Sequence, residues 1–171
     1  MTLLDDISLD NITPARLWSE LDPPTRVLAA EALFEGDPAL RGLAHQAIAA
    51  ALRFRVAGVR KLSVGKRIDY LARVVRPEHE LACSLLMALH LGRRQALLRS
   101  FLDHLEIPNE DGLIDADHEL GPVDAEALAP AVAGLRERFE GAQVDLYLAS
   151  LLALDPDVWG GLAPLLQAGP D

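Results

Sequence analysis

The sequence predicts an all-α protein, and three observations carry that prediction. Leu (33) and Ala (26), which favour helices, supply 59 of the 171 residues, whereas Val, Ile, Thr and the aromatic residues, which favour strands, supply 27. Four prolines directly follow a residue that can cap a helix N-terminus. Between these starts, apolar residues recur every three or four positions, as they do along one face of a helix.

The capped prolines mark the starts of four helices. Pro is tolerated in the first turn of a helix, and a preceding Thr or Asp can accept hydrogen bonds from the free N–H groups there. The pairs are Thr13-Pro14, Asp22-Pro23, Asp37-Pro38 and Asp155-Pro156. They predict helices over about 13–21, 23–35, 38–55 and 156–166.

Apolar spacing predicts five more helices, which brings the total to about nine. Their ranges are 63–76 after Ser63, 77–91 from Pro77, 93–107, about 124–139 and 142–154. Pro130 must either kink the helix near 124–139 or delay its start. The 77–91 segment is apolar on nearly every side, so we expect it to be the central helix of the protein.

The connections between these helices are mostly short, which favours antiparallel neighbours. We therefore expect residues 1–171 to form a single all-α domain, either an irregular multi-helix bundle or a short helical-repeat-like stack. The one long connection is the acidic loop at 108–123, which is the place where the chain could be subdivided.

Charge is distributed unevenly along the chain, although the total is −10. Residues 53–76 hold eight Lys or Arg against the single acid Asp69, whereas residues 1–37 hold eight acids and two bases, and residues 100–171 hold fifteen acids and two bases. On the helix at 63–76, basic side chains share the face opposite the apolar one, with Tyr70 at its border. The candidate partner-binding residues are Lys66, Arg67, Tyr70, Arg73 and Arg76.

Three interpretations of this basic segment remain open. It is a solvated surface that pairs with the protein's own acids, including Asp69 with Arg73 at i,i+4, or it binds an acidic partner, or it binds nucleic acid. Nucleic-acid binding is disfavoured because a dedicated binder is usually basic overall and carries stacking aromatics near its basic patch. Here the pI is about 4.9, and only Tyr70 and Phe54 are near.

The sequence contains no recognisable catalytic or cofactor-binding motif, so we expect no cofactor, no metal and no identifiable catalytic residue. His79, Cys83 and His90 share one helical face, but two helical turns separate Cys83 from His90, too far for one ion. The acids Asp115, Asp117 and Glu119 have the spacing of a calcium loop but lack its central Gly.

The acidic N-terminus (Asp5, Asp6) and the single Cys83 lead us to expect a cytoplasmic protein. No stretch is apolar for the roughly 20 residues that a membrane span needs.

We expect a non-catalytic protein-interaction module with an acidic protein partner. The alternatives are a ligand-binding protein or enzyme with a pocket between helices, where His79, Cys83, His90 and His104 are the first candidates, and a nucleic-acid binder. An apolar face on 142–166 leaves homodimerisation open.

Overall fold

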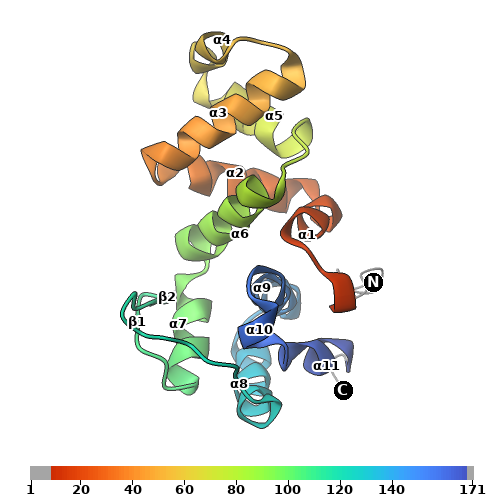
Figure 1. Cartoon of the computed structure of the whole chain (residues 1–171), viewed down its shortest axis with the longest axis vertical. Helices are drawn as coiled ribbons and strands as arrows, with labels where there is room; N and C mark the ends of the chain where they lie inside the picture. The colour runs from red at the N-terminus through yellow and green to blue at the C-terminus, as the bar shows by residue number, and fades with distance from the viewer. Residues whose placement is uncertain (1–8, 169–171) are drawn as a thin grey trace. The chain divides into compact units, whose positions relative to one another are not determined.

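The all-α prediction is confirmed by the computed structural model, which describes residues 9–168 (Figure 1). This range contains eleven α-helices, one 3₁₀ turn and one two-stranded hairpin. None of these helices has the length and apolar character that crossing a membrane requires. Asp5, Asp6 and the C-terminal Gly169-Pro170-Asp171 lie outside the described residues.

The chain divides into two compact units. The N-terminal unit, Pro14–Arg93, contains α1 (Pro14–Glu20), α2 (Pro23–Glu35), α3 (Pro38–Leu52), α4 (Val56–Arg60), α5 (Val64–Arg73) and α6 (His79–Arg93). The C-terminal unit, from Arg94 onward and including η1 (Leu9–Asn11), contains α7 (Gln95–His104), β1 (Asn109–Glu110), β2 (Leu113–Ile114), α8 (Ala125–Arg138), α9 (Gly141–Leu154), α10 (Pro156–Trp159) and α11 (Leu162–Gln167). The acidic loop at 108–123 lies wholly within the C-terminal unit.

The predicted helix caps are present in four places. The carboxylates of Asp22, Asp37 and Asp155 each accept a hydrogen bond from a backbone N–H two or three residues later, at 2.7 to 3.2 Å. The Ser63 hydroxyl accepts one at 3.3 Å at the start of α5. These residues therefore begin their helices for the reason inferred from the sequence, which is satisfaction of free N–H groups in the first turn.

Several of the predicted boundaries are wrong. The helix expected over 38–55 ends at Leu52, because Arg53 takes the left-handed conformation (φ 55°) that terminates a helix, and α4 follows as a separate short helix. The helix expected from Pro77 begins at His79. The helices expected over 63–76 and 93–107 end three residues earlier, at Arg73 and His104, so Arg76 lies in the connection to α6. Helix α8 (Ala125–Arg138) matches the range predicted for it and runs through Pro130 without a delayed start.

The helix expected over 156–166 is broken into α10 and α11 at Gly160-Gly161. A Cβ on Gly161 would lie 2.9 Å from Leu128 Cδ1 and 3.0 Å from the Val123 carbonyl oxygen. Because a backbone carbonyl cannot move aside as a side chain can, only glycine allows α11 to begin this close to α8.

Helix α6 is the central helix of the N-terminal unit. Its leucines 81, 85, 86 and 89 are buried, and it packs against α1, α2 and α3. Helix α2 packs against both α6 and α5. This arrangement places α5 and the α5–α6 connection at the surface, next to α1 and α3.

Helix α9 is the core helix of the C-terminal unit, since every residue from Val144 to Ser150 is buried. Phe101 of α7 is fully buried and lies against two aromatic rings, with centroid distances of 5.6 Å to Tyr147 and 5.8 Å to Trp159. Burial of the Tyr147 ring raises the pKa of its hydroxyl well above the ordinary value. The two tryptophans are therefore core residues of different units, with Trp18 2% exposed and Trp159 4% exposed.

Candidate functional site

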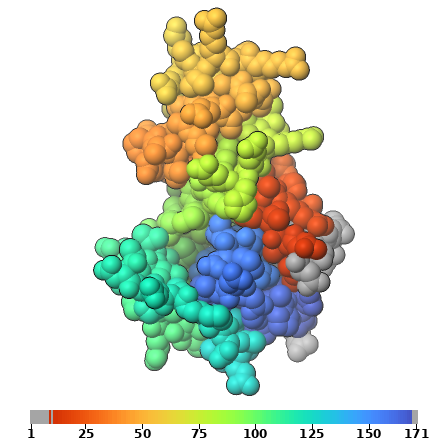
Figure 2. Space-filling view, in the orientation of Figure 1, coloured from red at the N-terminus to blue at the C-terminus, as the bar shows by residue number. Residues whose placement is uncertain are grey.

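The two units differ in net charge. Twelve Lys and Arg against eight Asp and Glu give residues 14–93 a formal charge of +4. Four bases against eighteen acids give the rest of the chain −14, and the two values sum to the total of −10. Figure 2 shows long side chains projecting from the yellow segment around α4. The N-terminal unit is thus a basic body in a protein that is acidic overall.

Four of the five predicted partner-binding residues lie at the surface of this unit. Lys66, Arg73 and Arg76 are exposed and Tyr70 is half-buried, all on α5 or immediately after it. Arg73 forms the ion pair with Asp69 that the i,i+4 spacing predicts. We call Lys66, Tyr70, Arg73 and Arg76 the α5 basic surface.

The bases of residues 53–76 are largely unneutralised. Within the N-terminal unit, which the structure describes throughout, Arg73 is the only one of these eight bases with a carboxylate within 4 Å. Self-pairing in this unit is therefore limited to Asp69 with Arg73. An exposed pair of this kind is worth only a few tenths of a kcal/mol, so Arg73 remains open to a competing anion. Pairing with the acids of the terminal segments stays a prediction.

The fifth predicted residue, Arg67, lies differently. Its side chain is half-buried, its Cζ lies 5.6 Å from the centroid of the Phe34 ring, and its Nη1 lies 2.8 Å from Nε2 of His45. The Phe34 and His45 rings also pack on each other, at 5.6 Å. Arg67 thus ties α5 to α2 and α3 by a cation–π contact and a hydrogen bond. Arg67 therefore anchors α5, the helix that carries the α5 basic surface, to α2 and α3.

His45 is neutral in this arrangement. Desolvation by burial, followed by the positive charges of Arg67, Arg60 and Arg41, lowers the pKa of His45 below its ordinary value of 6.5. Because a guanidinium can only donate, Nε2 of His45 accepts from Arg67, and the ring proton is on Nδ1. Three arginines, Arg41, Arg60 and Arg67, therefore surround one neutral histidine, and within the N-terminal unit none of the three forms an ion pair with a carboxylate.

Two grooves flank the connection between α5 and α6. The first has a volume of about 780 Å³ and is lined by Ala15, Trp18 and Ser19 of α1, Arg26 of α2, and residues 73–77. Among the described residues, its lining contains three arginines and no carboxylate. Nη2 of Arg26 donates to the Ser19 carbonyl at 2.6 Å, which fixes the guanidinium, while its buried Nε has no hydrogen-bond partner within residues 9–168.

The second groove, of about 500 Å³, lies on the α3 side of the same connection. It is mostly aliphatic, with Glu78 and Glu80 among its polar lining residues, and its apolar lining includes Leu43, Ala47, Ala50, Ala51, Val74 and Leu81. Residues 74–77 line both grooves. The α5–α6 connection is therefore a ridge with a cationic groove on one side and an aliphatic groove on the other.

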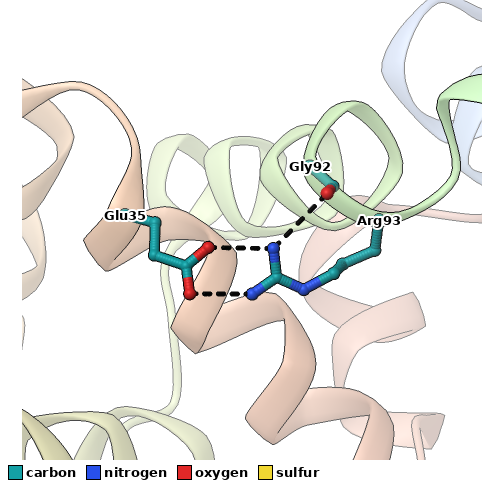
Figure 3. Close-up of polar contacts among 3 residues, drawn as sticks. All are labelled: Glu35, Gly92 and Arg93. Atoms are coloured by element: carbon teal, nitrogen blue, oxygen red, sulfur yellow. Dashed lines mark hydrogen bonds and ion pairs between the residues drawn. The ribbon is translucent and has the colours of Figure 1, made fainter.

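One bidentate ion pair within this unit joins the C-terminal ends of α2 and α6. Arg93 at the end of α6 donates from Nη1 and Nη2 to the two carboxylate oxygens of Glu35 at the end of α2, at 2.9 and 3.0 Å (Figure 3). The hydrogen bond from Arg93 holds the pKa of Glu35 below its ordinary value. Both groups are thus already paired, and Arg93 does not add to the free positive charge of the unit.

The histidine and cysteine candidates do not form a reactive site. Nε2 of His79 lies 3.5 Å from Sγ of Cys83, but burial raises the pKa of the Cys83 thiol, which opposes a nucleophilic thiolate. His90 is buried on the same helix. Between residues 9 and 168, no group of three or more His, Cys, Asp or Glu side chains is arranged to hold a metal ion.

The C-terminal unit has a small polar pocket of about 390 Å³ lined by Ser100, Asp103, His104 and Arg138 among others. The Ser100 hydroxyl accepts a hydrogen bond from Arg138 at 2.8 Å, and Asp103 accepts one from Asn109 at 3.0 Å. The serine is therefore bonded to a cation that cannot accept its proton, so these residues do not form a nucleophile–base pair.

Comparisons of the chain with protein-family models, with curated proteins and with solved structures found no match. Arg26 is the residue of the cationic groove that the sequence analysis missed, because it lies 47 positions before Arg73 on another helix. No local pattern links them; only the packing of α1 and α2 beside the α5–α6 connection brings them together.

Proposed function

We propose that this chain is a cytoplasmic, non-catalytic protein-interaction module that binds an acidic protein partner through its α5 basic surface. The observation that supports this proposal is the set of unneutralised bases in residues 53–76, concentrated on a unit of charge +4. Complementary charge speeds association and selects partners of opposite sign. Homodimerisation and a nucleic-acid ligand are alternatives that the experiments below address.

The proposal is tested by reversing the exposed bases of the surface. Lys66→Glu, Arg73→Glu and Arg76→Glu together change the formal charge by −6 without touching a buried side chain. Arg73→Glu also places a like charge four residues after Asp69, which costs α5 a few tenths of a kcal/mol. We expect far-UV circular dichroism to be unchanged and capture of acidic proteins from an extract of the source cells to be lost.

A matched control carries the same charge change elsewhere in the unit. Arg53→Glu, Arg55→Glu and Lys61→Glu also change the charge by −6, at exposed residues that line neither groove. This variant should retain the partner captured by the wild-type chain. If both triple variants capture the same proteins as the wild type, the proposal is wrong. If the captured material is nucleic acid, shown by nuclease sensitivity, the nucleic-acid alternative replaces it.

A further inference from the structure

The α5–α6 ridge combines positive charge with exposed apolar surface. Val74 is 46% exposed although it is a large aliphatic residue, and it lines both grooves. Val75 and Pro77 beside it are buried, so the ridge backbone is anchored in the unit. An exposed apolar residue at the centre of a charged surface is typical of an interface, where apolar contacts supply affinity and a polar rim supplies orientation.

The arginines that line the cationic groove are positioned to bind an anion. Arg73 and Arg76 are exposed, and Arg26 is held in place through its bond to the Ser19 carbonyl. Among the described residues Arg26 forms no ion pair, and its buried Nε has no hydrogen-bond partner, so its positive charge is not neutralised by a carboxylate. Guanidinium groups recognise carboxylates through paired N–H donors, which makes a carboxylate the matching ligand.

We infer that the cationic groove binds a short segment of a protein partner in which a carboxylate side chain stands next to a large apolar side chain. This inference rests on the proposed function and adds the chemistry of the partner. The carboxylate pairs with Arg26, Arg73 and Arg76, and the apolar side chain packs on Val74 and extends toward the aliphatic groove.

The same lining disfavours a nucleic acid in this groove. Single-stranded nucleic acids bind by stacking bases on exposed aromatic rings. The one aromatic residue of the lining, Trp18, is 2% exposed, and the rest of the lining consists of three arginines, Ser19 and the small or aliphatic residues Ala15, Val74, Val75 and Pro77. A base would therefore find no ring to stack on, whereas an aliphatic side chain finds a matching surface.

The probe for the test is a random peptide library displayed on phage, selected against the immobilised full chain. We expect the enriched peptides to carry Asp or Glu within two positions of Leu, Ile, Met or Phe. The best peptide is then synthesised, and its affinity is measured by fluorescence anisotropy. Arg26→Met should weaken it by about tenfold or more, the effect of removing one charge-assisted hydrogen bond.

Two further variants keep the test independent of folding effects at Arg26. Val74→Asn changes an exposed side chain and should weaken the peptide severalfold by removing its apolar contact. Arg55→Met, an exposed arginine outside both grooves, should leave the affinity unchanged. A second copy of the chain bound in the groove would compete with the peptide, so sedimentation of the chain alone serves as a control. We expect it to show a monomer at the concentrations used.

The outcomes separate this inference from the proposed function. Equal affinity of the wild type, Arg26→Met and Val74→Asn overturns the groove assignment, and loss of binding in the α5 triple reversal would then still support an acidic partner. Enrichment of peptides without acids overturns both. Self-association that is lost in Arg26→Met would assign the groove to a second copy and overturn the peptide inference.

Discussion

Truncation of Phe101 to Ala tests whether the two units have separate cores. Phe101 is 0% exposed in the C-terminal unit, where its ring contacts those of Tyr147 and Trp159. Removing a buried phenylalanine costs about 3–5 kcal/mol. With a urea m-value of about 1–3 kcal/mol/M, this loss lowers the unfolding midpoint by roughly 2 M.

The two tryptophans allow this loss to be assigned to a unit. Trp18 belongs to the N-terminal unit and Trp159 to the C-terminal unit. We expect Phe101→Ala to lower the urea midpoint reported by Trp159 in a Trp18→Phe background. In a Trp159→Phe background, the midpoint reported by Trp18 should not change. The measurement is tryptophan fluorescence during urea unfolding.

A reciprocal variant serves as the control. Leu71 is fully buried on α5, so Leu71→Ala should cost about 2–5 kcal/mol in the N-terminal unit and should shift only the Trp18 transition. Phe101→Leu keeps an apolar side chain and provides a milder version of the first change. If either truncation shifts both tryptophan transitions equally, the chain unfolds as one cooperative body and the reasoning from separate cores fails.

Three other changes test particular contacts. His45→Gln keeps an acceptor for Arg67 but cannot be protonated. Wild-type His45 has a lowered pKa in the folded state, so the unfolded chain binds more protons, and stability falls as the pH drops through and below about 6.5. The variant should flatten this fall in urea unfolding measured across pH, and an unchanged pH profile would contradict the placement of the histidine. Gly112→Ala should destabilise the C-terminal unit by roughly 1–3 kcal/mol, since Gly112 has φ 90° and its Cβ would lie 2.5 Å from that of Leu98; a Trp159 midpoint equal to that of the wild type would refute this. Asp22→Ala removes the α2 cap and should lower the Trp18 midpoint by the equivalent of about 1 kcal/mol, whereas Asp22→Asn should largely preserve it.

Local chemistry explains what the sequence could predict. Caps such as Asp22 and Ser63 act on N–H groups within three residues, so the pattern that predicts them is visible in a few letters of sequence. Helix α4 was missed because it has five residues and no side-chain cap. The hairpin at 109–114 was missed although Asp111-Gly112 is a typical two-residue hairpin turn with positive φ at both residues (50° and 90°), because strands of only two residues leave no alternating pattern in the sequence.

The candidate site could be predicted only in part, for the same reason. Lys66 and Arg73 lie on the polar face of α5, which periodicity makes visible, whereas Arg76 lies three residues beyond the end of that helix. The burial of Arg67 against Phe34 and His45 depends on residues 33 and 22 positions away. Arg26 enters the groove through the packing of α1 and α2, which no spacing rule encodes.

The most direct test of the central claim is a map of where an acidic partner binds. The amide and methyl resonances of the isotope-labelled full chain are recorded while the selected acidic peptide is added. We predict that the shifts concentrate on α5, on Val74 and its neighbours in the ridge, and on Arg26, and that they disappear in the variant carrying Lys66→Glu, Arg73→Glu and Arg76→Glu. Shifts confined to α7–α11, or shifts that persist in that variant, would contradict the account.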